Sequence, residues 1–147
     1  MSYSLIFSLA IVPVLPLWAL MIVAPGWDWT RRIVTQPWSY APLTVVYVVL
    51  VALNAADVVP AIVNNPRLET VGPLLATTAG ATIGWVHFLA FDVFVGRWIY
   101  LDARAAGRSP WLMAPVLLLT FLFGPAGLLV YLCLRAVRPE SYASPHG

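Results

Sequence analysis

The fold is decided by a run without any charged side chain, SPWLMAPVLLLTFLFGPAGLLVYLCL, at residues 109–134. Three similar charge-free runs precede it, at residues 1–27, 33–56 and 70–91. Each is long enough to supply the roughly 20 apolar residues that cross a bilayer. The sequence therefore predicts an all-α integral membrane protein, a bundle of four transmembrane helices near residues 4–23, 41–63, 75–102 and 111–137.

Composition supports this interpretation. The chain has 147 residues, of which 61% are hydrophobic and 10% charged, whereas a soluble domain is about 25% charged. The eight arginines are scattered over every loop, so the net charge of +2 does not indicate binding to nucleic acid. We expect one transmembrane domain over residues 1–138 and a disordered tail over residues 139–147.

Prolines and arginines predict details of the bundle. Pro13 and Pro16 should kink the first helix, and Pro125 should bend the fourth, because a proline ring displaces the carbonyl one turn earlier. Four crossings place both chain ends on one side of the membrane. The arginines of the first and third loops, counted against Arg67, Arg135 and Arg138, favour cytoplasmic loops one and three and both ends outside.

Four ionisable residues fall within the predicted spans: Asp57, His87, Asp92 and Arg97. Such a group costs several kcal/mol in a bilayer unless it is paired or hydrated, so each is a functional candidate by default. We expect the two aspartates and the histidine to face the bundle interior. Their predicted depths allow Asp57 to pair with His87, and Arg97 to bend toward Asp92. Alternatively, the polar groups only tie helices together, and Arg97 is an interfacial anchor.

The sequence offers few ligands for a metal or cofactor. One histidine, Cys133 and two aspartates lie at membrane depth, which does not give the three or four well-spaced ligands of a zinc site, and a di-iron site would need many more His or Glu. The chain contains no phosphate-binding loop and no dinucleotide fingerprint. The single cysteine also excludes an intrachain disulfide. We therefore expect no metal and no cofactor.

Two stretches resemble the abscisic-acid-deficient-four-like family of membrane proteins: WVHFLAFDVFVGRWIYLD at residues 85–102 and LFGPAGLLVYL at residues 122–132. The resemblance extends over essentially the whole chain in length and span order. The family is named for a plastid member required to make neoxanthin from violaxanthin, a reaction in which an epoxide opens to an allenic alcohol. The first span begins almost at Met1, without a transit segment, so we expect a multi-pass protein of a bacterial inner membrane.

The resemblance implies acid–base isomerisation of a carotenoid or related isoprenoid. Opening an epoxide and removing a neighbouring proton requires one acid and one base but no redox cofactor. On this hypothesis Asp92 is the acid, and His87 or Asp57 is the base. The residues expected to bind the substrate are Asn54, Trp85, Phe88, Phe91, Arg97, Trp98 and Tyr100.

Other functions stay open at this point. The expected partners are a hydrophobic isoprenoid or carotenoid ligand, membrane lipid, a second copy of the chain, or other membrane proteins of a carotenoid pathway. The alternative hypothesis is a non-catalytic membrane subunit or a module that binds lipid or pigment, in which the same polar residues hold the helices together. A proton or solute carrier is disfavoured, because the chain shows no inverted repeat.

Overall fold

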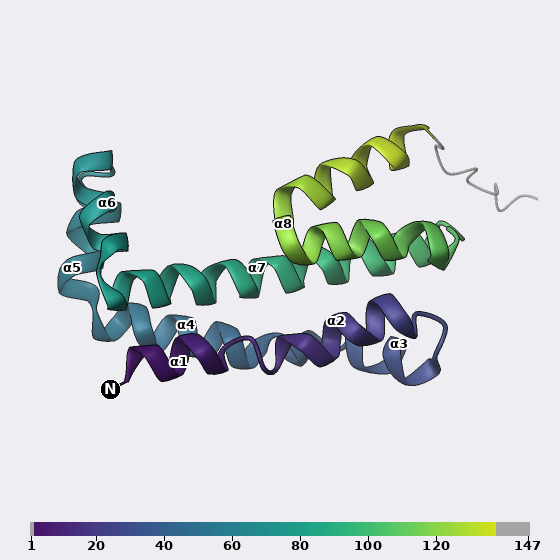
Figure 1. Cartoon of the computed structure of the whole chain (residues 1–147), viewed down its shortest axis with the longest axis horizontal. Coiled ribbons are helices and arrows are strands. Elements are labelled where there is room, and N and C mark those ends of the chain that lie inside the picture. Colours follow the sequence, from purple (N-terminus) through teal and green to yellow (C-terminus); the bar gives the residue numbers. More distant parts are fainter. Residues whose placement is uncertain (1, 138–147) are drawn as a thin grey trace, which may run out of the picture.

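The computed structural model describes residues 2–137, and over that range it contains helices and no strands. The predicted all-α class is confirmed there, whereas the expected disordered tail at 139–147 lies outside the described residues. In chain order the elements are α1 (Tyr3–Leu9), α2 (Val14–Val23), α3 (Asp28–Thr35), the 3₁₀ turn η1 (Pro37–Ser39), α4 (Ala41–Leu53), α5 (Ala55–Val59), the π-helical turn η2 (Pro60–Asn64), α6 (Leu68–Ala76), α7 (Thr78–Ala105) and α8 (Pro110–Val137) (Figure 1).

The longest uninterrupted helix is α7, and the other long helices pack along it (Figure 1). None of the thirteen prolines of the chain falls in its 28 residues. At its N-terminal end the Thr77 side chain accepts a hydrogen bond of 2.9 Å from the backbone N–H of Gly80. At 1.5 Å per residue α7 is about 42 Å long, more than the roughly 30 Å of a bilayer core.

By length and composition alone, three segments within residues 2–137 could cross a membrane: Tyr3–Val23, Thr78–Ala105 and Pro110–Val137. The first includes the break at residues 10–13 between α1 and α2, as its prolines predicted. A fourth span exists only if Ala41–Leu53 and Ala55–Asn64 are counted together, and these two pieces meet at an angle of 82°. The prediction of four continuous transmembrane helices is therefore met in part.

The predicted second helix breaks at Asn54. The Asn54 side chain donates to the Leu50 carbonyl at 2.8 Å and accepts a hydrogen bond of 3.1 Å from the Tyr3 hydroxyl. Beyond the break α5 and η2 leave the bundle axis, and α6 returns beside them across the end of the bundle (Figure 1). Two predictions are corrected here: residues 41–63 are not one helix, and residues 68–76 form α6 where a loop was expected.

The helix α8 reverses direction in its middle (Figure 1). Phe123 and Gly124 have non-helical backbone angles directly before Pro125, so the predicted bend is confirmed and is sharper than expected. The two halves approach so closely that a Cβ atom at Gly127 would overlap the backbone of Thr120. Only glycine fits at this position, and α8 is a helical hairpin instead of a straight crossing.

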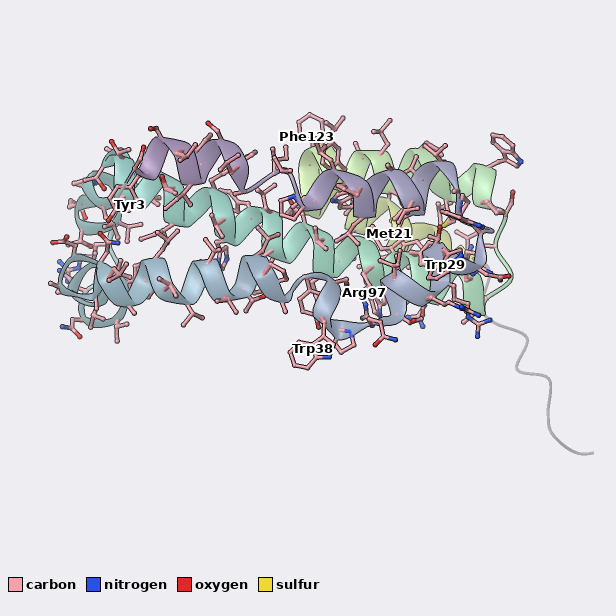
Figure 2. The ribbon with its side chains drawn as sticks, turned by 90° about the horizontal axis from the view of Figure 1, so that it is seen from below. Tyr3, Met21, Trp29, Trp38, Arg97 and Phe123 are labelled. Atoms are coloured by element: carbon pink, nitrogen blue, oxygen red, sulfur yellow. The ribbon has the colours of Figure 1, made fainter. Side chains whose placement is uncertain are left out.

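Contacts with α7 hold the returning half of α8. The Tyr131 hydroxyl donates to the Asp102 carboxylate, and Arg135 Nε lies 3.1 Å from the same carboxylate. The rings of Trp98 and Tyr131 meet edge to face at 5.5 Å. The end of α8 therefore lies beside the end of α7, whereas Tyr3 lies near the start of α7 in Figure 2. The start of α1 and the end of α8 thus lie at opposite ends of the bundle, whereas four straight crossings would have placed them at the same end, because α8 turns back.

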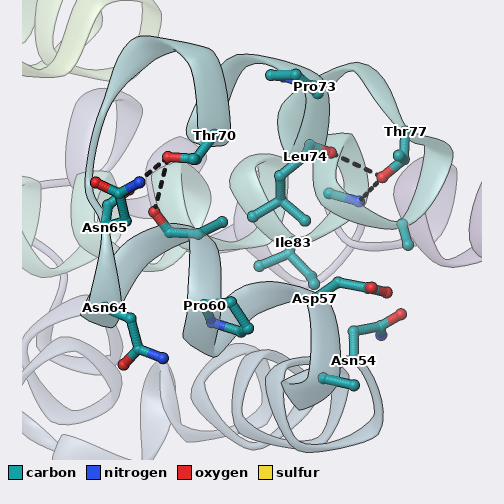
Figure 3. A pocket seen from close by; sticks show the side chains of 14 residues that line it. Asn54, Asp57, Pro60, Asn64, Asn65, Thr70, Pro73, Leu74, Thr77 and Ile83 are labelled. Carbon is teal, nitrogen blue, oxygen red and sulfur yellow. Dashed lines mark hydrogen bonds between the residues drawn. The ribbon is translucent and has the colours of Figure 1, made fainter.

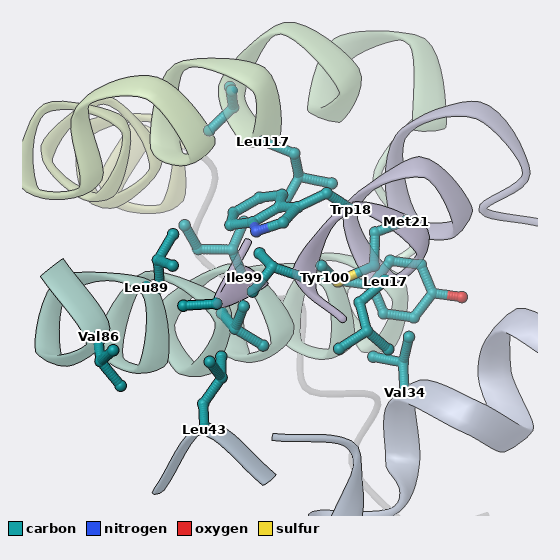
Figure 4. Packing of buried hydrophobic residues seen from close by; sticks show 14 of the residues in the cluster. Leu17, Trp18, Met21, Val34, Leu43, Val86, Leu89, Ile99, Tyr100 and Leu117 are labelled. Atoms are coloured by element: carbon teal, nitrogen blue, oxygen red, sulfur yellow. The ribbon is translucent and has the colours of Figure 1, made fainter. Parts of the chain in front are cut away.

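The core is centred on the α2–α7–α8 contact (Figure 4). The indole of Trp18, which is 2% exposed, lies directly against Gly96. The Phe121 ring of α8 contacts the same indole at 5.4 Å. Because any side chain at position 96 would displace the indole, this glycine sets the distance between α2 and α7.

The hairpin of α8 should depend on Gly127. We expect Gly127→Ala to destabilise the fold by roughly 1–3 kcal/mol, because the added methyl group overlaps the Thr120 backbone. Thermal unfolding in detergent, followed by size-exclusion fluorescence, measures this. The matched control is Gly26→Ala, since a Cβ there meets no atom within 4 Å. Equal stability of the two variants would contradict the close packing of the hairpin.

Candidate functional site

The candidate residues on α7 are distributed around the helix and do not form one site. Trp85 stacks on Phe7 of α1 with ring centroids 5.1 Å apart. Trp98 packs on Tyr131 of α8, and the Tyr100 hydroxyl donates to the Pro25 carbonyl at 2.8 Å. These three side chains are used for packing between helices, and none of them lines the two hollows described below. Phe88 does not line either hollow, because its side chain is 61% exposed on the outer face of the bundle.

Asp92 lies at the reversal of α8. It is half-buried, and a Cβ atom at Gly124 would meet its carboxyl group. His87 is five residues earlier, about 140° around the helix at 100° per residue, and it faces α4. The structure therefore separates the proposed acid Asp92 from the proposed base His87.

Arg97 is held by the end of α3. Its Nε donates to the Val34 carbonyl at 2.6 Å and its Nη2 to the Thr35 carbonyl at 2.8 Å. Its guanidinium also lies 5.9 Å from the centre of the Tyr40 ring. The expectation that Arg97 bends toward Asp92 is wrong, because the unpaired carbonyls at the C-terminal end of α3 attract the cation more closely.

His87 lies in an aromatic groove between α4 and α7. Its ring is 5.3 Å from that of Tyr47 and 4.6 Å from that of Phe91. The groove has a volume of about 260 Å³ and is lined by Tyr40, Thr44, Tyr47, His87, Ala90, Phe91 and Phe94. Flat aromatic walls with a single imidazole suit a slender apolar chain.

A larger, polar cavity lies at the end of the bundle (Figure 3). It has a volume of about 610 Å³, and its polar lining residues are Asn54, Asp57, Asn64, Asn65, Thr70 and Thr77. The Thr70 hydroxyl lies within hydrogen-bond distance of several backbone carbonyls, among them that of Arg67 at 2.9 Å, and the Thr77 hydroxyl donates to the Leu74 carbonyl at 2.7 Å. Figure 3 shows Asn54 and Asp57 together on the opposite wall. The cavity thus presents a carboxylate and amides to a polar group.

The expected position of Asp57 is corrected. Its helix leaves the bundle at Asn54, so Asp57 is exposed and faces the polar cavity instead of the bundle interior. It lines a different hollow from His87, and the predicted pair between these two side chains is not formed in the described structure. Over residues 2–137, no three His, Cys, Asp or Glu side chains lie close enough to hold a metal ion.

The cavity and the groove are two successive hollows along α7, and we call the line that joins them, from the C-terminal end of α4 along α7, the α4–α7 seam. On α7, Ile83 lines the cavity and His87, one helical turn later, lines the groove. At the break after α4, Asn54 lines the cavity, and Tyr47 of α4, seven residues earlier, lines the groove. The cavity end of the seam is therefore polar, and its groove end is aromatic.

The profile of the family described as ABA DEFICIENT 4-like matches residues 5–131. This chain belongs to the ABA DEFICIENT 4-like family. A curated relative, "Protein ABA DEFICIENT 4, chloroplastic" of Arabidopsis thaliana, is 24% identical over 144 residues. That alignment covers 95% of this chain but 64% of the relative's length. No solved structure matches the chain. The family resemblance found in the sequence is thus confirmed.

Several residues that line the seam of this ABA DEFICIENT 4-like chain are not among the site residues expected from the sequence. They are Tyr40, Thr44, Tyr47 and Phe94 in the groove and Asn64, Asn65, Thr70 and Thr77 in the cavity. Tyr47 and Asn54 share one helix face by their spacing of seven residues, which was a usable signal. The residues of α6 gave no such signal, because Gly72 and Pro73 within this segment predict a loop and not a helix.

Arg97 should act as a helix cap. We expect Arg97→Gln to release the end of α3, because two hydrogen bonds from a charged donor are lost, each worth about 1.5–3 kcal/mol. Hydrogen exchange of residues 28–39 should then speed up by tenfold or more. The control is Arg31→Gln, on the exposed side of the same helix. Unchanged exchange in Arg97→Gln would contradict the cap.

Proposed function

We propose that this protein is a multi-pass membrane protein that binds an elongated isoprenoid, a carotenoid or a related molecule, along the α4–α7 seam and isomerises it by acid–base chemistry. The observation that carries the proposal is the change from polar to aromatic lining along one seam. Amides, hydroxyls and a carboxylate in the cavity suit an oxygenated end group. The groove suits the apolar chain that follows it.

The dimensions of the seam agree with such a ligand. From Gly80 in the cavity to Phe94 in the groove, α7 rises about 21 Å. Both hollows open at the surface of the helices, where a ligand dissolved in the membrane can enter sideways. Membership of the ABA DEFICIENT 4-like family adds support for a carotenoid.

The reaction needs only proton transfer. An acid protonates an epoxide oxygen as the C–O bond breaks, and a base removes a neighbouring C–H proton whose electron pair forms the new double bond. Nothing is oxidised or reduced overall. Asp57 in the cavity and His87 in the groove are the carboxyl and the imidazole of the seam, and with Tyr40 and Tyr47 of the groove they are the seam residues whose side chains commonly serve as general acids or bases. Asp92, against α8, is assigned a packing role instead.

The proposal predicts the effects of two conservative variants. Asp57→Asn and His87→Gln keep size and hydrogen bonding but change or remove the transferable proton. At least one of them should lower turnover of a purified epoxy-xanthophyll by roughly a hundredfold or more. The isomer has the same mass as the substrate, so chromatography coupled to mass spectrometry measures the product. Both variants should still bind the pigment.

Two controls decide between the alternatives. Asp28→Asn removes an exposed carboxylate of α3, outside the seam, and should leave turnover unchanged. Loss of turnover in Asp92→Asn with a normal fold would instead support the acid role expected from the sequence. If the native protein retains pigment but forms no isomer, the protein is a pigment-binding module. Failure to retain pigment overturns the proposal.

A further inference from the structure

Arginines gather at one end of the bundle, which we call the arginine end. It contains Arg31 and Arg32 of α3, Arg97 and Arg104 of α7, Arg108 of the turn after α7, and Arg135 of α8. Contacts place them together: Arg97 binds the end of α3, Arg104 donates to the Pro25 carbonyl just before α3, and Arg135 pairs with Asp102. Of the described arginines, Arg67 alone lies at the opposite end.

The charge difference between the two ends is large. At the arginine end, six arginines face Asp28 and Asp102, which leaves an excess of four positive charges. At the opposite end, among the described residues, Arg67 faces Asp57 and Glu69, an excess of one negative charge. Chain orientation in a membrane follows this kind of asymmetry.

The reversal of α8 creates part of the asymmetry. A straight helix starting at Pro110 would carry Arg135 about 37 Å from the turn, to the opposite end. In the structure Arg135 instead lies 3.1 Å from Asp102 and over the Trp98 ring. Each half of α8, at residues 110–122 and 125–137, is about 20 Å long and too short to cross a bilayer core of roughly 30 Å.

The surface of the arginine end carries the groups that suit lipid headgroups. Three tryptophans are exposed there, Trp27, Trp29 and Trp111, whereas the exposed Trp38 points outward nearer the middle of the bundle in Figure 2. Arg31 and Arg32 are exposed on α3, while Thr30 and Val34 of the same helix are buried. An amphipathic helix with exposed guanidinium and indole groups is typical of the headgroup layer, and guanidinium binds phosphate by two parallel hydrogen bonds.

We propose that the arginine end is an interaction surface for the anionic lipid headgroups of the cytoplasmic leaflet, and that α8 dips into the membrane from this leaflet and returns to it. The N-terminal helix then starts on the opposite side, and the end of α8 lies on the cytoplasmic side. This arrangement does not depend on which ligand the α4–α7 seam binds.

Cysteine labelling tests the arrangement. In a Cys133→Ala background, which removes the only cysteine, single cysteines replace Asn65, Ser109 and Val137. In intact cells a membrane-impermeant maleimide should label Asn65→Cys, whereas Ser109→Cys and Val137→Cys should react only after permeabilisation. Labelling of Ser109→Cys and Val137→Cys on opposite sides overturns the reversal, and labelling of Asn65→Cys only after permeabilisation overturns the orientation.

A second readout avoids substitutions in the helices. Green fluorescent protein fused after the last residue of the native chain should fluoresce, because this protein folds in the cytoplasm. Alkaline phosphatase fused at the same position should be inactive, because this enzyme becomes active only after export. The opposite pair of results overturns the proposal.

Lipid binding tests the surface itself. The purified protein is titrated with phosphatidylglycerol or phosphatidylcholine, and bound lipids are counted by native mass spectrometry. Phosphatidylglycerol should bind more tightly, and Arg31→Gln combined with Arg32→Gln should weaken it about fivefold per arginine. Arg67→Gln, at the opposite end, is the matched control and should have no effect. Equal binding of the two lipids, or an equal effect of Arg67→Gln, overturns the assignment.

Discussion

The structure depends on one constraint: in an apolar environment each backbone N–H and C=O must find a partner within the protein. The helix α7 meets this constraint alone, because no proline interrupts its 28 residues. The other long segments contain prolines or break, and each of their breaks lies against a neighbour. The break at Asn54 is tied to Tyr3 and Leu50, and the reversal of α8 packs on Asp92. An intact central helix therefore allows the surrounding helices to be irregular.

The two sharpest breaks produce the two features with functional potential. At Asn54 the chain turns away from the bundle, and the space between α5, η2, α6 and the start of α7 becomes the polar cavity. At Gly124 the chain turns back, and Asp102 holds Tyr131 and Arg135 at the arginine end. Without the first break the α4–α7 seam would lack a polar end. Without the second, Arg135 would lie at the opposite end, and the excess of positive charge at the arginine end would fall from four to three.

The distribution of polar side chains around α7 explains why the candidate site had to be revised. Spacing along a helix gives the angle between residues but does not identify the neighbour at each angle. Asp92, His87 and Arg97 each meet a different helix, namely α8, α4 and α3. A carboxyl and an imidazole close together in sequence are therefore separated by the width of the helix, and the remaining candidates, Asp57 and His87, line two different hollows.

The sequence by itself determined the helical class, the family, the apolar segments and the places where prolines disturb them, because hydropathy, composition and proline geometry act locally. It also singled out His87, Asn54 and Asp57, which line the seam. Tertiary structure decided the rest. Whether a proline bend is slight or reverses the chain depends on contacts between residues far apart, such as Gly127 with Thr120 and Arg135 with Asp102. Those contacts arise only when helices pack, and they set which end each arginine reaches.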